Sequence, residues 1–306
     1  MSTSEAKASY QLGVASRLLG LSLALAAAVL WGLNGVAAQD LFQRHGVDPR
    51  WLVTMRMVGG GLVLLAVFRP GWPRRHLRWM CLWAVLGLAA AQYTWFAAIS
   101  LSNVATATFI QYLYVPLTAA WQMMRGEVRP MPVRLAAVAA AGTGVALVIL
   151  GQGLAVAGLQ MNVLGIVFAL ASAVATAFMF LGSAPLVRAV GVQSSTAWGL
   201  VIGGIPMLLW APPWAGHATG DPLAVAALVV FAVLVGTALA FSLSFASLTR
   251  ITPTEVAVTS SVEPAVAALT SFIFLGLTLR PLQYMGGAVI LSAVIILAYA
   301  GRFTPG

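Results

Sequence analysis

The sequence contains two versions of one pattern, at residues 85–150 and 232–299. Each version runs through an apolar stretch, a short polar break, a second apolar stretch with a central proline, a glycine-containing turn, a proline and a third apolar stretch. Pro116 corresponds to Pro264 and Gly126 to Gly276, and a weaker match joins residues 20–32 to 165–177. We therefore predict a duplicated chain.

The composition indicates that this chain folds in a bilayer. Hydrophobic residues make up 61% of it and charged residues 8%, whereas about a quarter of the residues of a soluble domain are charged. A helix needs about 20 apolar residues to span the hydrocarbon core. Ten such stretches are present, near residues 18–38, 51–68, 79–98, 104–123, 134–151, 161–183, 194–211, 223–246, 254–275 and 282–300.

Five of the ten stretches fall in each half of the chain. Because five is odd, the two copies must enter the membrane from opposite sides, which gives an inverted repeat. The predicted fold is an all-α polytopic membrane protein with ten transmembrane helices, arranged as a 5+5 inverted repeat around a central cavity. We expect a disordered cytoplasmic tail over residues 1–16, a first five-helix repeat over 17–151 and a second over 161–301, together forming one structural unit.

The distribution of basic residues predicts the orientation. With the N-terminus in the cytoplasm, twelve Lys and Arg residues lie in inside segments and three in outside segments, a strong positive-inside bias. An even number of helices returns the C-terminus to the cytoplasm. The net charge of +9 is therefore a topological signal, and we expect no nucleic-acid partner because the charges occupy short loops and not one folded face.

Several reaction classes lack the residues that they need. The only lysine is Lys7, in the tail, so no phosphate-binding GxxxxGK[ST] loop exists, and neither ATP hydrolysis nor an ATPase subunit is predicted. The three histidines, His45, His76 and His217, lie in loops. No interior cluster for metal or nucleophilic chemistry is present. We expect no enzyme activity, no cofactor and no metal, which leaves secondary transport or facilitated diffusion.

Motifs along the chain resemble one family. They are Leu30-Trp31-Gly32 at the end of an Ala-rich first helix, Arg56 early in the second, Gly126-Glu127 after the fourth, Glu263-Pro264 in the ninth, and a terminal GGAVILSAVIILA block. In this order and spacing, the chain resembles the drug/metabolite transporter superfamily, in the EamA group, and YddG-type aromatic amino-acid exporters in particular. One difference is Gly276-Leu277, where the family pattern usually has Gly-Glu.

The resemblance implies a bacterial inner-membrane exporter. In such a protein, helices 1–4 and 6–9 surround the central cavity and helices 5 and 10 pack at the periphery. The residues agree, because the fifth stretch is nearly featureless while polar and aromatic residues gather on the others. Polar groups that face lipid are costly, so these groups should face one another or water. The candidate cavity residues are Trp31, Asn34, Gln92, Tyr93, Phe96, Gln111, Tyr112, Thr176, Phe180, Phe241, Ser244, Thr259, Ser260 and Glu263.

Two prolines are expected to kink the helices that carry many of these residues. Pro116 and Pro264 each remove one helical hydrogen bond, and Pro116 leaves the Tyr112 carbonyl as a spare acceptor near mid-membrane. Transporters place their sites at such discontinuities. An alternative is that Ser, Thr and Gln side chains only join helices to one another, and that Tyr93, Tyr112 and Tyr114 belong to an interfacial aromatic belt.

Two ionisable residues lie inside predicted helices. Glu263 is about nine residues into the ninth helix, roughly 13 Å along its axis, and could take up a proton, bind a substrate ammonium or hold the kinked segment together. Arg56 lies near the outer end of the second helix. We expect it to snorkel to the headgroups or to form a structural ion pair behind the cavity, and not to contact the ligand.

These observations favour export of a neutral, zwitterionic or weakly cationic molecule. Phosphate recognition relies on Arg or Lys, and Arg56 is the only interior cation. Amino acids, aromatic ones first, are the preferred substrates, chiefly from the resemblance. The alternatives are multidrug efflux of lipophilic cations and a non-transporting membrane scaffold. Small-molecule substrate and membrane lipid are the expected partners, and a monomer is compatible with the sequence.

Overall fold

The computed structural model describes residues 3–126, 131–151 and 163–301, and these form helices and no strands. The helices of the first half are α1 (Thr3–Gln43), α2 (Pro49–Thr54), η1 (Met55–Gly59), α3 (Gly60–Phe68), η2 (Arg74–His76), α4 (Leu77–Leu82), η3 (Trp83–Ala89), α5 (Ala90–Ser100), α6 (Val104–Gln111), α7 (Tyr114–Met124) and α8 (Pro132–Gly151). Those of the second half are α9 (Val163–Val190), α10 (Val192–Trp210), η4 (Pro213–Ala215), α11 (Pro222–Val233), η5 (Leu234–Leu239), α12 (Ala240–Ser247), α13 (Pro253–Thr259), α14 (Val262–Leu275) and α15 (Pro281–Gly301).

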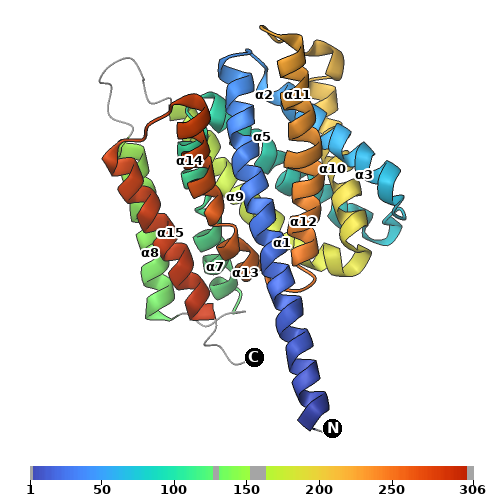
Figure 1. Cartoon of the computed structure of the whole chain (residues 1–306), viewed down its shortest axis with the longest axis vertical. Helices are drawn as coiled ribbons and strands as arrows, with labels where there is room; N and C mark the ends of the chain where they lie inside the picture. Colours follow the sequence, from blue (N-terminus) through green and yellow to red (C-terminus); the bar gives the residue numbers. More distant parts are fainter. Residues whose placement is uncertain (1–2, 127–130, 152–162, 302–306) are drawn as a thin grey trace.

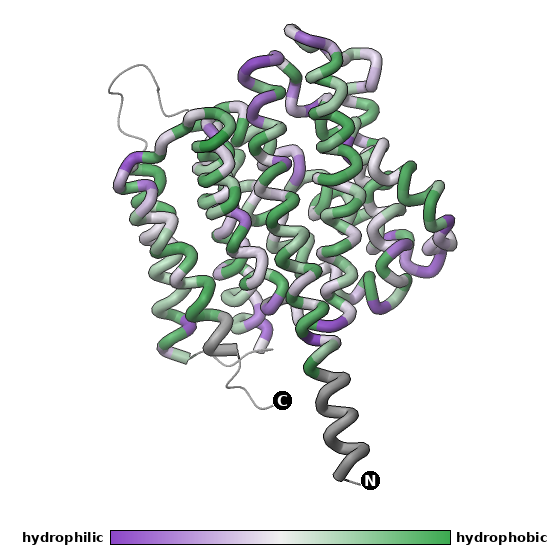
Figure 2. Tube along the Cα trace, viewed as in Figure 1, coloured by the Kyte–Doolittle hydropathy of each residue, from purple (hydrophilic) through white to green (hydrophobic). Residues whose placement is uncertain are grey.

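These elements build ten spans. Within the described residues, eight helical runs are long and apolar enough to cross a membrane, and α15 adds a shorter apolar helix. The broken pair α6 and α7 supplies the remaining span. Three spans contain a π-helical segment (η1, η3 and η5) between two α-helical parts, so each remains one continuous rod. Figure 2 shows that hydrophilic residues lie mainly at the ends of the helices and in the turns.

Local sequence signals explain where several spans begin. Asp48 and Asp221 each accept a hydrogen bond from a backbone N–H of the following turn, at 2.7 Å from Arg50 and 3.0 Å from Leu223. Both caps are followed by proline, whose missing N–H costs nothing in the first turn of a helix. Thr252 caps α13 in the same way, with Pro253 next. The residues at these three positions thus determine where the helices that follow them begin.

The N-terminal segment belongs to the first helix. The backbone is helical from Thr3, so α1 extends through residues that we predicted to form a disordered tail over 1–16. Figure 1 shows this part of α1 projecting beyond the rest of the bundle. The segment is rich in residues with high helix propensity, including Ala, Glu, Lys, Gln and Leu. The backbone of this segment thus continues the first span as one helix, and the disordered tail over residues 1–16 stays a prediction.

The last helix of each half demonstrates the inverted relation between the halves. A Cβ atom at Gly144 of α8 would lie 2.8 Å from the Gly286 carbonyl oxygen of α15, and one at Gly151 would lie 2.8 Å from the Gln283 nitrogen. From Gly144 to Gly151 the residue number rises along α8, while the number of the contacted residue in α15 falls from 286 to 283. These equivalent helices therefore run antiparallel. Small residues allow this close backbone approach. Figure 1 shows the pair side by side at one edge of the bundle, as expected for peripheral helices.

The two spans that contain Pro116 and Pro264 are interrupted four residues before the proline. The fourth span breaks between α6 and α7, at Tyr112, and the ninth breaks between α13 and α14, at Ser260. A proline at position i cannot bond the carbonyl of residue i−4. In both cases the backbone N–H of the residue three positions later donates to that carbonyl instead. The distance is 3.2 Å from the Val115 nitrogen to the Tyr112 oxygen and 2.9 Å from the Glu263 nitrogen to the Ser260 oxygen. The Tyr112 carbonyl is therefore not the spare acceptor that we expected.

Trp83 fills the space where three helical spans meet. Its side chain is fully buried, and its indole Nε1 donates to the Met179 carbonyl oxygen at 2.8 Å. The ring lies between two glycines on α9 and α10. A Cβ at Gly182 would lie 2.6 Å from the Trp83 Cδ1 atom, and one at Gly199 would lie 2.5 Å from Cζ3. The two glycines make room for the tryptophan.

We expect Gly199→Ala to lower the free energy of unfolding by about 1–3 kcal/mol, because an added methyl group must displace a rigid, enclosed ring. Gly142→Ala in α8 is the matched control, since a Cβ there would meet nothing within 4 Å. That change should be neutral or slightly stabilising, because alanine favours a helix. Thermal unfolding in detergent compares the two variants, and equal melting temperatures would contradict the packing assigned to Trp83.

Candidate functional site

A small cavity lies between helices of both halves. Its volume is about 30 Å³, enough for one or two water molecules and far below the few hundred Å³ of a typical small-molecule site. It is therefore closed around its centre. The residues that line it are Trp31, Gln92, Trp95, Gln111, Tyr114, Thr176, Met179, Phe180, Phe241 and Glu263.

Seven residues named from the sequence as cavity candidates lie in this lining: Trp31, Gln92, Gln111, Thr176, Phe180, Phe241 and Glu263. Sequence reasoning did not include Trp95, Tyr114 or Met179 in the candidate set. Helical spacing offered a signal for two of them, because Trp95 follows Gln92 by three positions and Met179 follows Thr176 by three. Tyr114 was named only in the aromatic-belt alternative.

The other seven candidates do not line the cavity. Five of them are buried in the surrounding packing: Asn34, Phe96, Tyr112, Ser244 and Ser260. Thr259 is half-buried and donates to the Glu255 carbonyl oxygen of its own helix at 2.8 Å. Tyr93 is also half-buried, and its ring centre lies 4.8 Å from that of Trp210 and 5.7 Å from that of Phe168. These three aromatic rings lie outside the cavity lining, which fits the alternative that Tyr93 belongs to an interfacial aromatic belt.

Arg56 is buried, contrary to the expectation that it snorkels. Its side chain is 1% exposed. The guanidinium donates to the Gln92 Oε1 atom at 2.8 Å, to the Thr237 hydroxyl at 2.8 Å and to the Gly236 carbonyl oxygen at 3.0 Å. It also lies 4.4 Å from the centre of the Phe96 ring.

The π-helical segments explain how Arg56 reaches these groups. Arg56 belongs to η1, while Gly236 and Thr237 belong to η5. A π-helical turn redirects side chains and loosens backbone hydrogen bonding, which exposes carbonyl groups to such a donor. Among the described residues Arg56 forms no ion pair. It is a hydrogen-bonded cation without a carboxylate, directly behind Gln92 in the cavity wall.

Asn34 packs against the same segment. It is fully buried, and within the described part of the chain neither its amide nitrogen nor its oxygen has a hydrogen-bond partner. A Cβ at Gly236 would lie 2.3 Å from the Asn34 Oδ1 atom, so only glycine fits there. One turn earlier on α1, the Trp31 indole Nε1 is also without a partner among the described residues. Such orphaned groups are unusual in a closed interior.

Glu263 and Tyr112 connect the two helix breaks. The Tyr112 hydroxyl lies 3.0 Å from the Glu263 Oε2 atom, and it also contacts the Ser260 carbonyl oxygen. Tyr112 comes from the break in the first half, and the other two residues come from the break in the second. Glu263 is 7% exposed and, within the described residues, forms no ion pair.

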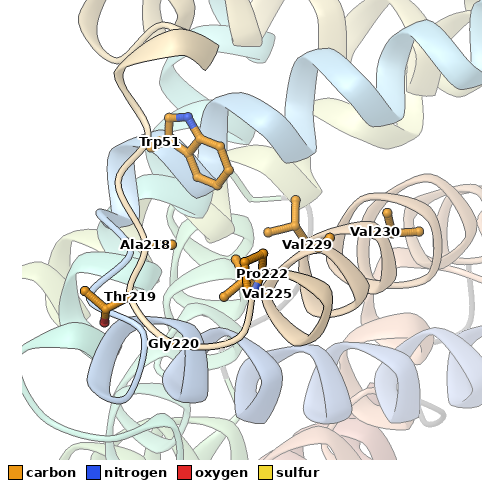
Figure 3. Close-up of a pocket in the computed structure, with 9 residues that line it drawn as sticks. Trp51, Ala218, Thr219, Gly220, Pro222, Val225, Val229 and Val230 are labelled. Carbon is orange, nitrogen blue, oxygen red and sulfur yellow. The ribbon is translucent and has the colours of Figure 1, made fainter.

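Two wider pockets lie elsewhere. One of about 390 Å³, lined mostly by apolar groups of α11 and the preceding loop, opens beside Trp51 (Figure 3). Another of about 700 Å³ lies beside Arg74, Arg75 and His76 in the loop before α4. Neither contains the buried polar groups described above, whereas ligand sites combine an apolar wall with a few converging polar groups. The central cavity is therefore the stronger candidate despite its small volume.

The sequence matches the model of the EamA-like transporter family twice, over residues 18–150 and 163–299. The chain belongs to the EamA-like transporter family. The two matched segments fall on the two five-helix repeats. Membership identifies the protein as a membrane transporter of the drug/metabolite superfamily.

Known proteins agree with this assignment. The chain is similar to the uncharacterized inner membrane transporter YicL of Salmonella typhimurium (strain LT2), with 27% identity over 293 residues that cover 92% of this chain and 96% of that protein. A chain in a solved crystal structure has 19% identity and a TM-score of 0.65, over 94% of this chain and 98% of that one. At that identity the second similarity concerns the fold alone.

Proposed function

We propose that this protein exports amino acids and related small metabolites from the cytoplasm by alternating access, with aromatic amino acids favoured. Transport is secondary-active or facilitative. The observation that carries the proposal is the lining of the central cavity, in which five aromatic rings, two glutamines and one buried carboxyl group from both halves meet. Aromatic walls accommodate a flat apolar side group, and the polar groups suit the charged ends of an amino acid.

The charges of the lining support this substrate class. It contains no Arg and no Lys, whereas recognition of a phosphate group depends on such cations. Tyr114 and Phe180 stack with ring centres 5.1 Å apart and planes inclined by 16°. A planar side chain inserted between such rings would keep favourable aromatic contacts.

The closed cavity supports a mechanism that requires movement. An amino acid does not fit into about 30 Å³, so the helices must separate to admit it. The two breaks in the fourth and ninth spans are the natural hinges, because they already lack regular helical hydrogen bonds. We propose that the repeats open this centre alternately to the two sides of the membrane.

The same proposal includes a location in the bacterial inner membrane with both termini in the cytoplasm. The excess of Lys and Arg in the segments assigned to the inside supports this orientation, and the similarity to the inner membrane transporter YicL supports the choice of membrane. The expected partners are the substrate and lipid, without nucleic acid or an ATPase subunit.

Counterflow in liposomes tests the function directly. Purified protein is reconstituted into vesicles loaded with one unlabelled compound, and uptake of the same labelled compound is measured. The panel contains amino acids, cationic dyes and phosphorylated sugars. We expect counterflow of aromatic amino acids above that of protein-free vesicles and none of phosphorylated sugars. Counterflow of dyes alone would support the second candidate below, and no counterflow of any compound would reject amino-acid export.

Efflux of lipophilic cations is the second candidate, favoured by Glu263. A cation within the membrane needs a carboxylate to balance its charge, whereas an amino acid carries its own counter-charge. Glu263→Gln should therefore abolish dye transport if the protein is a drug exporter, and only weaken amino-acid transport, by about tenfold, if it is an amino-acid exporter. Counterflow with both substrate types distinguishes these results, and unchanged transport of both would exclude any role for the carboxylate.

A further inference from the structure

We infer that the central cavity orients its substrate, with the carboxylate of the amino acid at Gln92 and Trp31 and its ammonium group at Glu263. This assignment rests on the proposed amino-acid transport. It adds the identity of the protein group that meets each charged end. It also explains which molecules of similar shape should be rejected.

The orientation of the Gln92 amide follows from its neighbour. The Arg56 guanidinium has only donors, so the atom that it contacts at 2.8 Å must be the amide oxygen of Gln92. The amide nitrogen, with its two N–H donors, is then the end left for other partners. Because Gln92 lines the cavity, the cavity wall presents the N–H donors of its amide, and the buried Arg56 guanidinium lies directly behind them.

Trp31 adds a second donor to the lining. An indole Nε1–H can only donate, and this one is buried and has no partner among the described residues. The ring packs edge-on against Phe241, with centres 5.1 Å apart. A buried donor without an acceptor loses about one hydrogen bond of free energy. An incoming carboxylate restores that bond.

The carboxyl of Glu263 presents the opposite chemistry. Its Oε2 atom contacts the Tyr112 hydroxyl at 3.0 Å, and no hydrogen bond to Oε1 is formed within the described part of the chain. Glu263 and Arg56 do not pair with each other. Glu263 lies in the cavity wall, and Arg56 lies behind Gln92. A zwitterion between Glu263 and Gln92 can therefore place its ammonium group at the Glu263 carboxylate. Its own carboxylate can then accept hydrogen bonds from the Gln92 amide, which the Arg56 charge supports.

This arrangement predicts selectivity for molecules that carry both charged groups. L-Tryptophan satisfies both ends. Tryptamine lacks the carboxylate and leaves the Gln92 and Trp31 donors unpaired, while indole-3-propionate lacks the ammonium group and leaves Glu263 without a cation. Loss of a hydrogen bond to a charged group lowers binding by about 10- to 100-fold. We expect each analogue to compete with tryptophan counterflow that much more weakly.

Gln92→Glu tests the assignment, because it keeps an oxygen for Arg56 but replaces the two donors by an acceptor. Tryptophan counterflow should fall about 10- to 100-fold, and tryptamine should compete better relative to tryptophan. Glu263→Gln should change selectivity in the other direction, with indole-3-propionate gaining relative to tryptophan. Gln193→Glu, at an exposed position on α10, makes the same chemical change outside the cavity and should alter neither ratio.

The outcomes separate this assignment from the proposed function. If the unaltered protein shows no tryptophan counterflow, the proposed function fails and the assignment fails with it. If tryptophan is transported but Gln92→Glu changes tryptophan and tryptamine in equal proportion, only the orientation is wrong. Trp31→Phe, which keeps an aromatic ring, removes one donor independently. It should shift the same ratio towards tryptamine, and an unchanged ratio would overturn the assignment even where Gln92→Glu does not fold.

Discussion

Arg56→Leu should lower the free energy of unfolding by about 3–5 kcal/mol, because the substitution leaves several buried acceptors without a donor. The guanidinium bonds Gln92, Thr237 and the Gly236 carbonyl at 2.8, 2.8 and 3.0 Å, and all three residues are buried. Transport should fall about 100-fold, because the Gln92 amide is no longer held in one orientation. Thermal unfolding in detergent and tryptophan counterflow measure the two effects.

Two further variants identify the cause. Arg56→Lys keeps a charge but cannot reach three groups with the geometry of a planar fork, so we expect an intermediate loss. Arg250→Leu removes an exposed arginine whose guanidinium, among the described residues, bonds only the Thr249 hydroxyl and the Ala246 carbonyl oxygen. It should change the stability little. A stable, fully active Arg56→Leu protein would show that the buried network is dispensable.

Tyr112→Phe should lower the free energy of unfolding by about 2–4 kcal/mol, since it removes the hydroxyl group that joins the two helix breaks. That hydroxyl contacts the Ser260 carbonyl oxygen and lies 3.0 Å from the Glu263 Oε2 atom. Tyr112 is fully buried, so water cannot substitute. Because the Glu263 carboxyl group then loses its only hydrogen-bond partner among the described residues, transport should also fall, by about tenfold or more.

Tyr284→Phe provides the matched control. Tyr284 lies on α15 and is 52% exposed, so the same loss of one oxygen atom should leave both the melting temperature and the rate of counterflow unchanged. Equal effects of the two substitutions would indicate that the contact of the Tyr112 hydroxyl across the two helix breaks contributes neither to stability nor to transport. A loss of stability in Tyr112→Phe with full transport would restrict the contact to a structural role.

Much of the architecture could be predicted from the residues. Apolar runs of span length, turn residues between them and the paired prolines at positions 116 and 264 lead to two inverted five-helix repeats, because each of these signals acts locally along the chain. The start of the first helix was not predicted, since α1 begins at Thr3.

The candidate site was only half predicted, for a physical reason. Polar residues inside spans must face protein or water, which identifies Gln92, Gln111 and Glu263 as interior groups. That rule does not reveal which neighbour each one meets. Tyr93 satisfies it equally well, yet packs against Trp210 and Phe168 outside the cavity. Trp95 and Met179 line the cavity, although apolar side chains carry no such signal.

By itself the sequence determined the membrane environment, the number of spans, the duplication and the positions of the two helix breaks. Each of these depends on hydrophobicity or backbone chemistry within a few residues. Only the tertiary structure decided that Arg56 is buried against η5 and that the Tyr112 hydroxyl reaches across to Ser260 and Glu263. Those contacts join residues more than a hundred positions apart, and they exist because the antiparallel repeats bring the helices of the two halves together.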